Sequence, residues 1–431
     1  MKLNQIITTF LLSFTCLTSY AQKGPWSGKL SIQGIELPLI FNFNDNNCTL
    51  DSPSQGVNGI PAEKTVNENG LIKVTIKMIG ATFEGKMNGE CMEGTFTQNG
   101  FQLPLTLRAG KPLVKRPQTP TPPFPYEVEE ITFTNNGYTF NGTLSLPKGY
   151  TQNTPIVLMV TGSGQQNRDE ELLEHKPFAV IADALARNGI ASLRYDDRGW
   201  NDKSINFYDF TTNDFKQDAE AGLKLLRKRF SHVGVLGHSE GGSIALLLAA
   251  EGKTDFIISL AGMAISGKET LIEQNKDALN ALGLPNDVIV SYCKALNNVF
   301  DELAAGKDIN EIKTEGVPAT LKPLLEKSLQ QADNKYMRYV ISVNPSPSLS
   351  QIKCPVLALN GTKDKQVNCV KNLAALKEGL INCPHTIKTM EGLNHLFQHC
   401  QTGNITEYQQ IEETISPEVL NTIAEWINKL K

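Results

Sequence analysis

The sequence of 431 residues lacks the features that define several classes of protein. Its 41 Lys and Arg are balanced by 45 Asp and Glu, so a net charge of -4 provides no positive field for a phosphate backbone. It has no C-x-x-C pair or other cluster of zinc or calcium ligands. Beyond the first residues, no apolar run approaches the roughly 20 residues of a membrane span. We therefore expect no nucleic acid partner, no metal or other cofactor, and no stable membrane insertion once the N-terminal segment is removed.

The first 21 residues have the pattern of an export signal. Lys2 gives a positive start, an apolar stretch runs to Leu17, and Ser19-Tyr20-Ala21 is a small-x-small cleavage pattern. An uncleaved anchor is the less favoured alternative, because the apolar stretch is shorter than a membrane span. We expect cleavage after Ala21 and export to the periplasm or the extracellular space.

Seven of the eight cysteines lie beyond this signal, and they are widely spaced. Export permits disulfides, and Cys48 with Cys91 is one candidate pair. Buried unpaired thiols are an equally good interpretation. The sequence leaves both alternatives open.

A proline-rich segment, residues 111–125, divides the chain in two. Its prolines are too dense for helix or sheet, so we expect a semi-rigid extended spacer. Before it, residues 22–110 contain short, partly alternating apolar segments broken by Gly and Asn, which is typical of strands joined by tight turns. We expect a small all-β accessory domain there and a larger domain over residues 126–431.

Two segments of the all-β region resemble each other. Residues 28–39 are echoed by residues 94–105, with the glycines and a Leu-Pro-Leu triplet in register. Two equivalent hairpins in a barrel or a sandwich would explain this repeat. The region has no catalytic constellation, so we expect it to bind, orient or shield, with a glycan or a second copy of the chain as its candidate contact.

After the spacer the pattern of the sequence changes. A hairpin over Asn135-Asn136-Gly137 comes first, and continuous apolar runs then alternate with helical stretches. Such runs are typical of strands buried on both faces, and the helices between them of βαβ crossovers. The expected strands are Ile156–Val160, Ala191–Arg194, Val233–Leu236, Phe256–Leu260 and Val356–Leu359. We therefore expect an α/β fold with a doubly wound, mostly parallel sheet, and the helix-rich residues 266–347 as a cap inserted over its carboxyl edge.

A G-x-S-x-G motif, Gly237-His238-Ser239-Glu240-Gly241, stands between one of these strands and a helical stretch. The two glycines leave room for a tight turn, so the serine can adopt a strained backbone and project its hydroxyl above the sheet. A serine hydroxyl needs a neighbouring base that is itself oriented by an acid. The sequence therefore predicts Ser239 as a nucleophile, with its acid and then its base later in the chain.

Three histidines lie late enough to be this base. His385 stands beside a proline where a strand begins, and His399 lies in a helix-like stretch, whereas His395 lies in a turn directly after the strand 386–390. We therefore expect His395 to be the base. Asp364 follows another strand in a glycine-containing loop, at the edge where ligands meet an open α/β sheet. We expect it to hold the neutral tautomer of His395.

An oxyanion in such a site needs backbone N–H donors. One comes from the residue after the nucleophile, which is Glu240, and the other from the loop after an early strand. That loop is Thr161-Gly162-Ser163-Gly164, in which we prefer Ser163 and keep Gly164 as the alternative.

From about residue 127 to its end, the chain resembles bacterial carboxylesterases and serine aminopeptidase-like hydrolases of the α/β-hydrolase superfamily. The resemblance rests on four motifs: VTGSGQQNRDE from Val160, LRYDDRG from Leu193, GHSEGG from Gly237 and GLNH from Gly392. It implies an acyl-enzyme on Ser239 that water then hydrolyses. Trp200-Asn201 departs from the family pattern, because small residues are more usual after the Asp-Arg-Gly sequence.

The leading hypothesis is therefore an exported serine hydrolase that cleaves a small-molecule carboxylic ester. An aminopeptidase or acyl-peptidase is the first alternative, because the same triad also cleaves amides. A binding protein with a vestigial hydrolase domain is the second, and the complete set of Ser239, Asp364 and His395 argues against it. We also expect Arg168, Asp169, Asp197 and Arg198 to brace the loops through ion pairs.

Overall fold

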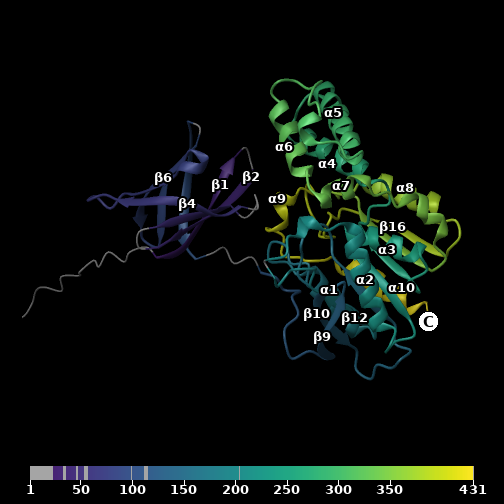
Figure 1. Ribbon diagram of the computed structural model, residues 1–431. Coiled ribbons are helices and arrows are strands. Elements are labelled where there is room, and N and C mark those ends of the chain that lie inside the picture. The colour runs from purple at the N-terminus through teal and green to yellow at the C-terminus, as the bar shows by residue number, and fades with distance from the viewer. Residues whose placement is uncertain are drawn as a thin grey trace, which may run out of the picture. The chain divides into compact units, whose positions relative to one another are not determined.

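The computed structural model describes residues 23–32, 35–44, 47–52, 57–98, 100–110, 115–202 and 204–430 (Figure 1). The chain divides into two compact units, Met1–Leu113 and Val114–Lys431. The export signal expected over residues 1–21 lies outside the described residues. No helix in the described ranges has the length and apolarity needed to cross a membrane.

The first unit is a closed antiparallel barrel. Its strands are β1 (Gly24–Ile32), β2 (Ile35–Phe43), β3 (Cys48–Ser52), β4 (Val57–Val66), β5 (Ile72–Ile76), β6 (Ala81–Asn88), β7 (Cys91–Gln98) and β8 (Phe101–Ala109). Each strand pairs with the next, and β8 closes on β1. The rings of Phe41, Phe43 and Phe83 pack together in the interior. The expected all-β domain is confirmed, and it is a barrel, not a sandwich.

The two copies of the sequence repeat fall on equivalent hairpins, β1–β2 and β7–β8. The repeated glycines have the same packing role in both. A Cβ added at Gly28 would collide with the carbonyl oxygen of Thr106, and one added at Gly94 with that of Glu84. Each glycine therefore permits a close approach between neighbouring strands.

The cysteines of the described residues are free thiols, so the candidate disulfide between Cys48 and Cys91 is not formed. Cys48 lies in the barrel core, where burial raises the pKa of its thiol to about 12. Because the thiolate is the reactive form, a thiol with so high a pKa is unreactive. The interpretation as buried unpaired thiols therefore fits this residue.

The second unit is built on a mixed sheet that is mostly parallel. Its strands are β9 (Glu127–Asn135), β10 (Tyr138–Leu146), β11 (Ile156–Val160), β12 (Ala191–Tyr195), β13 (Val233–His238), β14 (Ile257–Leu260), β15 (Val356–Gly361) and β16 (His385–Met390). They lie in the order β16-β15-β14-β13-β11-β12-β10-β9, in which β10 pairs antiparallel with both β9 and β12 and all other pairs are parallel. The predicted α/β architecture is confirmed.

Helices cover both faces of this sheet. Ile156 and Leu158 of β11 pack toward one layer, while Val157 and Met159 pack toward the other. The first layer contains α2 (Thr212–Leu226), α3 (Glu240–Ala250) and α8 (Cys369–Gly379), and the second α1 (Pro177–Arg187) and α10 (Pro417–Asn428). A short helix, α9 (Ile405–Tyr408), follows the last strand. Alternate burial on two faces explains why the strands are continuous apolar runs.

Residues between β14 and β15 form the expected helical insertion. It contains α4 (Gly267–Ala281), α5 (Asn286–Ala304), α6 (Lys322–Ala332) and α7 (Lys335–Ser342), which Figure 1 shows gathered in green at one end of the unit. These helices share an apolar cluster of their own around Tyr292 and Leu325. The insertion therefore has a hydrophobic core of its own, which holds its helices together as one unit.

The described part of the proline-rich segment, residues 115–125, belongs to the second unit. The guanidinium of Arg116 donates to the carbonyls of Leu173, Gln409 and Ile411 at 2.9–3.0 Å. The side chain of Gln118 bonds to the backbone near Ile415. This stretch contains neither helix nor strand, but it is not the extended spacer expected, because the Thr119 N–H closes a turn on the Arg116 carbonyl and the side chains tie it to the domain that follows.

Candidate active site

Ser239 stands at the turn between β13 and α3, at the carboxyl edge of the sheet. Its backbone has φ +54° and ψ -118°, a conformation that L-residues rarely adopt. Although it occupies the N-cap position of α3, its side chain forms no cap hydrogen bond. The hydroxyl is therefore not engaged by the helix that it precedes.

The two glycines of the motif allow this turn to form. A Cβ at Gly237 would collide with the carbonyl of Gly241, and a Cβ at Gly241 with the carbonyl of Val160 at the end of β11. Backbone lies against backbone at both points, so no flexible side chain can move aside. The glycines therefore determine how closely this strand–helix turn, which we call the elbow, approaches the neighbouring strand β11.

His395 and Asp364 form a buried pair in the loops after β16 and β15. Nδ1 of His395 lies 2.8 Å from Oδ2 of Asp364, and their side chains are 4% and 0% exposed. The other carboxylate oxygen accepts the N–H groups of Gln366 and Val367 at 2.7 and 2.9 Å. Because the carboxylate accepts the proton on Nδ1, Nε2 is left as the basic nitrogen.

The two other late histidines lie elsewhere. His385 is exposed at the start of β16. His399 is paired with Glu413 at 2.8 Å, but 64% of its side chain is exposed. Neither contributes to the cavity that holds Ser239 and His395.

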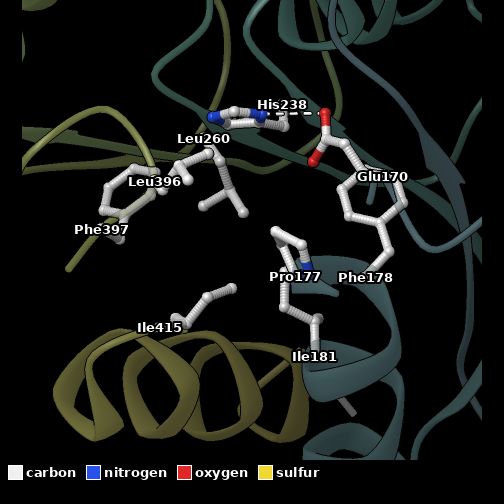
Figure 2. Close-up of a pocket in the computed structure, with 9 residues that line it drawn as sticks. All are labelled: Glu170, Pro177, Phe178, Ile181, His238, Leu260, Leu396, Phe397 and Ile415. Atoms are coloured by element: carbon white, nitrogen blue, oxygen red, sulfur yellow. Dashed lines mark hydrogen bonds and ion pairs between the residues drawn. The ribbon is translucent and has the colours of Figure 1, made fainter. Parts of the chain in front are cut away.

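A second acid–histidine pair, which no sequence motif indicated, lies next to the first. His238 Nδ1 lies 2.9 Å from Oε1 of Glu170, and its Nε2 lies 3.0 Å from the carbonyl oxygen of His395. Both ring nitrogens thus face acceptors, which requires the doubly protonated imidazolium. Figure 2 shows this pair above an apolar cavity of about 10 Å³, large enough for about one water.

Glu170 also holds the loop that follows β11, residues 161–168, which we name the oxyanion loop. Its Oε1 accepts the N–H of Gly162 at 2.7 Å. A Cβ at Gly162 would lie 3.2 Å from Cβ of Ser239, so the loop passes directly beside Ser239. One carboxylate therefore positions both the oxyanion loop and, through His238, the backbone of His395.

The cap contributes a buried tyrosine to the same region. Tyr336 of α7 donates to Glu240 Oε2 at 2.5 Å, and Thr212 donates to Oε1 at 2.6 Å. Burial raises the pKa of Glu240, and burial together with the Glu240 charge raises that of Tyr336. The Ser163 hydroxyl opposes the shift of Tyr336 as a hydrogen-bond donor to its phenol.

The candidate oxyanion donors are all unengaged in this structure. Among the described residues, no hydrogen bond engages the backbone N–H of Ser163, Gly164 or Glu240. Glu240 begins α3, where the first N–H groups have no partner within the helix. Ser163 and Gly164 therefore both remain candidate donors.

These groups share one cavity of about 340 Å³. Ser239, His395 and Ser163 lie in its wall, together with glutamines at positions 166, 274 and 366. The rest of the wall is largely apolar and is contributed by Leu172, Leu271, Tyr336, Met337, Val340, Leu396 and Ile405. No cluster of acids, cysteines and histidines in the described ranges could hold a metal ion.

Ion pairs brace the surrounding loops. Arg168 binds Asp196, with 2.7 Å between Nη2 and Oδ2, Arg194 binds Asp169, and Arg198 binds Asp218 at 2.6 Å. Asp197 forms no ion pair among the described residues. It accepts hydrogen bonds from the Thr161 hydroxyl and the Gln166 N–H at 2.9 and 2.7 Å.

A serine at a strand–helix elbow, with an acid–histidine pair at the same sheet edge, defines the class of α/β proteins that use a nucleophile elbow. A family model described as "alpha/beta hydrolase fold" matches residues 155–399. The chain belongs to this family.

Individual proteins similar to this chain share less than a third of their residues with it. Esterase EstD of Thermotoga maritima is 28% identical over 308 residues, which are 71% of this chain and 69% of that protein. Est1E of Butyrivibrio proteoclasticus, solved with ferulic acid, is 17% identical with a TM-score of 0.45, over 69% of this chain and 98% of that one. A dienelactone hydrolase of Anabaena variabilis is 15% identical with a TM-score of 0.41, over 71% and 98%.

The elbow glycines give a first prediction. Gly241→Ala forces a Cβ into the backbone of β11, so we expect the free energy of unfolding to fall by about 3 kcal/mol or more. Gly252→Ala is the matched control, because its Cβ meets no atom within 4 Å and only its φ of +68° is unfavourable. That change should cost about 1–2 kcal/mol. Urea unfolding measures both, and equal losses would contradict the account.

The pair of Glu170 and His238 predicts a pH dependence of stability. Burial disfavours the charge on His238, but the charge and hydrogen bond of Glu170 outweigh it, with a smaller effect from Asp364, so its pKa is raised above 6.5. A histidine with a raised folded pKa stabilises the fold fully below its unfolded value, and this stability disappears as the pH rises through the folded value.

Wild type should therefore exceed Glu170→Gln in free energy of unfolding by about 3 kcal/mol at pH 6. The difference should shrink as the pH rises above 6.5 and through the raised pKa of His238, because His238 then loses its proton in the wild type. Urea unfolding at each pH provides the measurement. A difference that stays constant over this range would show that His238 is not an imidazolium.

Proposed function

We propose that this protein hydrolyses neutral carboxylic esters through an acyl-enzyme on Ser239. The observation that carries the proposal is the placement of Ser239 and His395 in one cavity wall, with His395 bonded to a buried Asp364. The matched family and the relative named as an esterase agree with it.

In the proposed reaction, the Ser239 hydroxyl attacks the ester carbonyl carbon while Nε2 of His395 takes its proton. The tetrahedral intermediate then collapses, the bond to the alcohol oxygen breaks, and His395 returns the proton to the leaving alcohol. Water attacks the acyl-enzyme by the same route and releases the carboxylic acid. Asp364 stabilises the imidazolium that forms in each step.

We assign the oxyanion to the N–H groups of Glu240 and Ser163. Glu240 directly follows Ser239 in the chain, and Ser163 directly follows Gly162, the glycine that lies against Ser239. Each such donor in a site of this kind lowers the barrier by about 3–4 kcal/mol. Glu170 and Tyr336 are positioning residues in this scheme, because they act on the loop and the elbow and not on the substrate.

The charge of the cavity favours esters over peptides with a free amino terminus. An aminopeptidase needs a carboxylate for the α-ammonium group of its substrate, because a buried charge must be paired. Among the described residues, Glu170 is the only carboxylate in the cavity wall; its Oε1 accepts from His238 and Gly162, and its Oε2 is buried away from the cavity surface. The apolar side chains of the cap fit an acyl group instead. We also propose export, for which the support is the signal-like sequence of residues 1–21.

The role of the base gives a direct test. His395→Gln should lower kcat/KM for p-nitrophenyl acetate by about 10⁴-fold or more, since triad members act as a unit. His399→Gln is the matched control, because that histidine also pairs with a carboxylate but is exposed. It should retain wild-type activity. Loss of activity in both variants, or in neither, would overturn the assignment.

A comparison of ester and amide substrates distinguishes an esterase from an aminopeptidase. Wild type should hydrolyse p-nitrophenyl acetate and butyrate but not the p-nitroanilides of free amino acids, because the wall exposes no carboxylate oxygen to pair with their ammonium group. Turnover of the anilides without turnover of the esters would favour the aminopeptidase. Failure of a fluorophosphonate to label Ser239 would favour the vestigial domain.

A further inference from the structure

A polar hollow of about 290 Å³ lies beside the oxyanion loop and plays no part in the proposed chemistry. It is lined by Trp200 and Asn201, the two residues that depart from the family pattern, and by Thr139 and Asn141 of β10. We name it the Trp200 hollow. Its volume is close to the lower limit of about 300 Å³ for ligand sites.

A single layer of residues separates this hollow from the catalytic cavity. Gln166 lines the cavity and Asp197 lines the hollow, and the N–H of Gln166 donates to Asp197 Oδ2 at 2.7 Å. The side chain of Gln165 donates to the carbonyl of Arg198 at 2.8 Å. The two cavities therefore adjoin at the contact between Gln166 and Asp197.

The hollow combines a flat apolar surface with neutral hydrogen-bonding groups. Trp200 is 41% exposed, so part of its indole is accessible to a ligand in the hollow. Among the described residues, no hydrogen bond engages the side chain of Thr139 or Asn141 or the indole of Trp200. These groups are free to bind a ligand that carries both hydroxyl groups and an apolar face.

The carboxylates around the hollow do not form a cation site. Asp196 is held by the guanidinium of Arg168, and both oxygens of Asp197 accept hydrogen bonds from the oxyanion loop. The third carboxylate, Asp202, accepts the N–H and the hydroxyl of Ser204. Within the described ranges, no set of acids is arranged for a metal ion. The site is therefore suited to a neutral polyhydroxylated ligand and not to a cation.

We propose that the Trp200 hollow binds a sugar ring of the alcohol portion of the substrate, so that the natural ester is an acylated neutral saccharide. This inference rests on the proposed function, since it places the acyl group at Ser239. The indole supports the apolar face of the ring, and the amides of Asn141 and Asn201 bind its hydroxyl groups.

The first test compares two esters. Trp200→Ala should raise KM for partially acetylated xylo-oligosaccharides by about tenfold. Its kcat/KM for p-nitrophenyl acetate, which has no sugar, should stay within about twofold of wild type. Trp200→Phe keeps a flat ring and should restore most of the affinity. Leu282→Ala, which removes another exposed apolar side chain, should leave the kinetic constants for both substrates unchanged.

The second test measures binding without turnover. Xylotetraose and cellotetraose are titrated into full-length Ser239→Ala while the intrinsic tryptophan fluorescence is followed. A saturable change that disappears in Ser239→Ala/Trp200→Phe supports the proposal, since Trp26 and Trp426 remain in that variant. If neither sugar changes the signal and Trp200→Ala affects both esters equally, the proposal is wrong. Absence of p-nitrophenyl acetate turnover in wild type would instead refute the proposed function, while the titration still tests the hollow.

Discussion

The close approach between the backbone of Gly241 and the carbonyl of Val160 is the constraint on which the rest of this site depends. It brings the first turn of α3 against the end of β11, and the chain that leaves β11 is the oxyanion loop. Ser239 is thereby held at φ +54° beside Gly162. A strained conformation of this kind persists only when its surroundings determine it from several sides. Here the parallel sheet provides one side and the helix the other.

The side chains of the elbow connect it by hydrogen bonds to other parts of the domain. His238 points to Glu170 and to the backbone of His395, so it links the oxyanion loop to the loop that carries His395. Glu240 points to Tyr336, so it links the elbow to the inserted cap. Both links are buried and charge-assisted, which makes them strong and makes the loss of one partner costly. The catalytic geometry is thus built from contacts between segments that are far apart in the sequence.

Much of this could be predicted from the sequence, because the signals were local. Ser239 stood between a strand and a helix with glycines at fixed positions, and Asp364 and His395 each followed a strand of the sheet. Glu170 and Tyr336 could not be found in that way, since they are 68 and 96 residues from the elbow side chains that they bind. The same applies to Arg116, where dense proline correctly excluded helix and sheet but gave no sign of its contacts with three distant carbonyls. The glycine repeat predicted two hairpins, whereas closure of the barrel depended on pairing between β1 and β8, the ends of the unit.

The most direct test of the account is to trap the covalent intermediate. Wild-type protein is mixed with excess p-nitrophenyl acetate, quenched in acid within the first turnover and digested for mass spectrometry. The account predicts one acetyl group on the peptide that contains Ser239, formed together with a burst of p-nitrophenol equivalent to the enzyme present. An acetyl group on any other residue, or hydrolysis without an acylated Ser239, would contradict it.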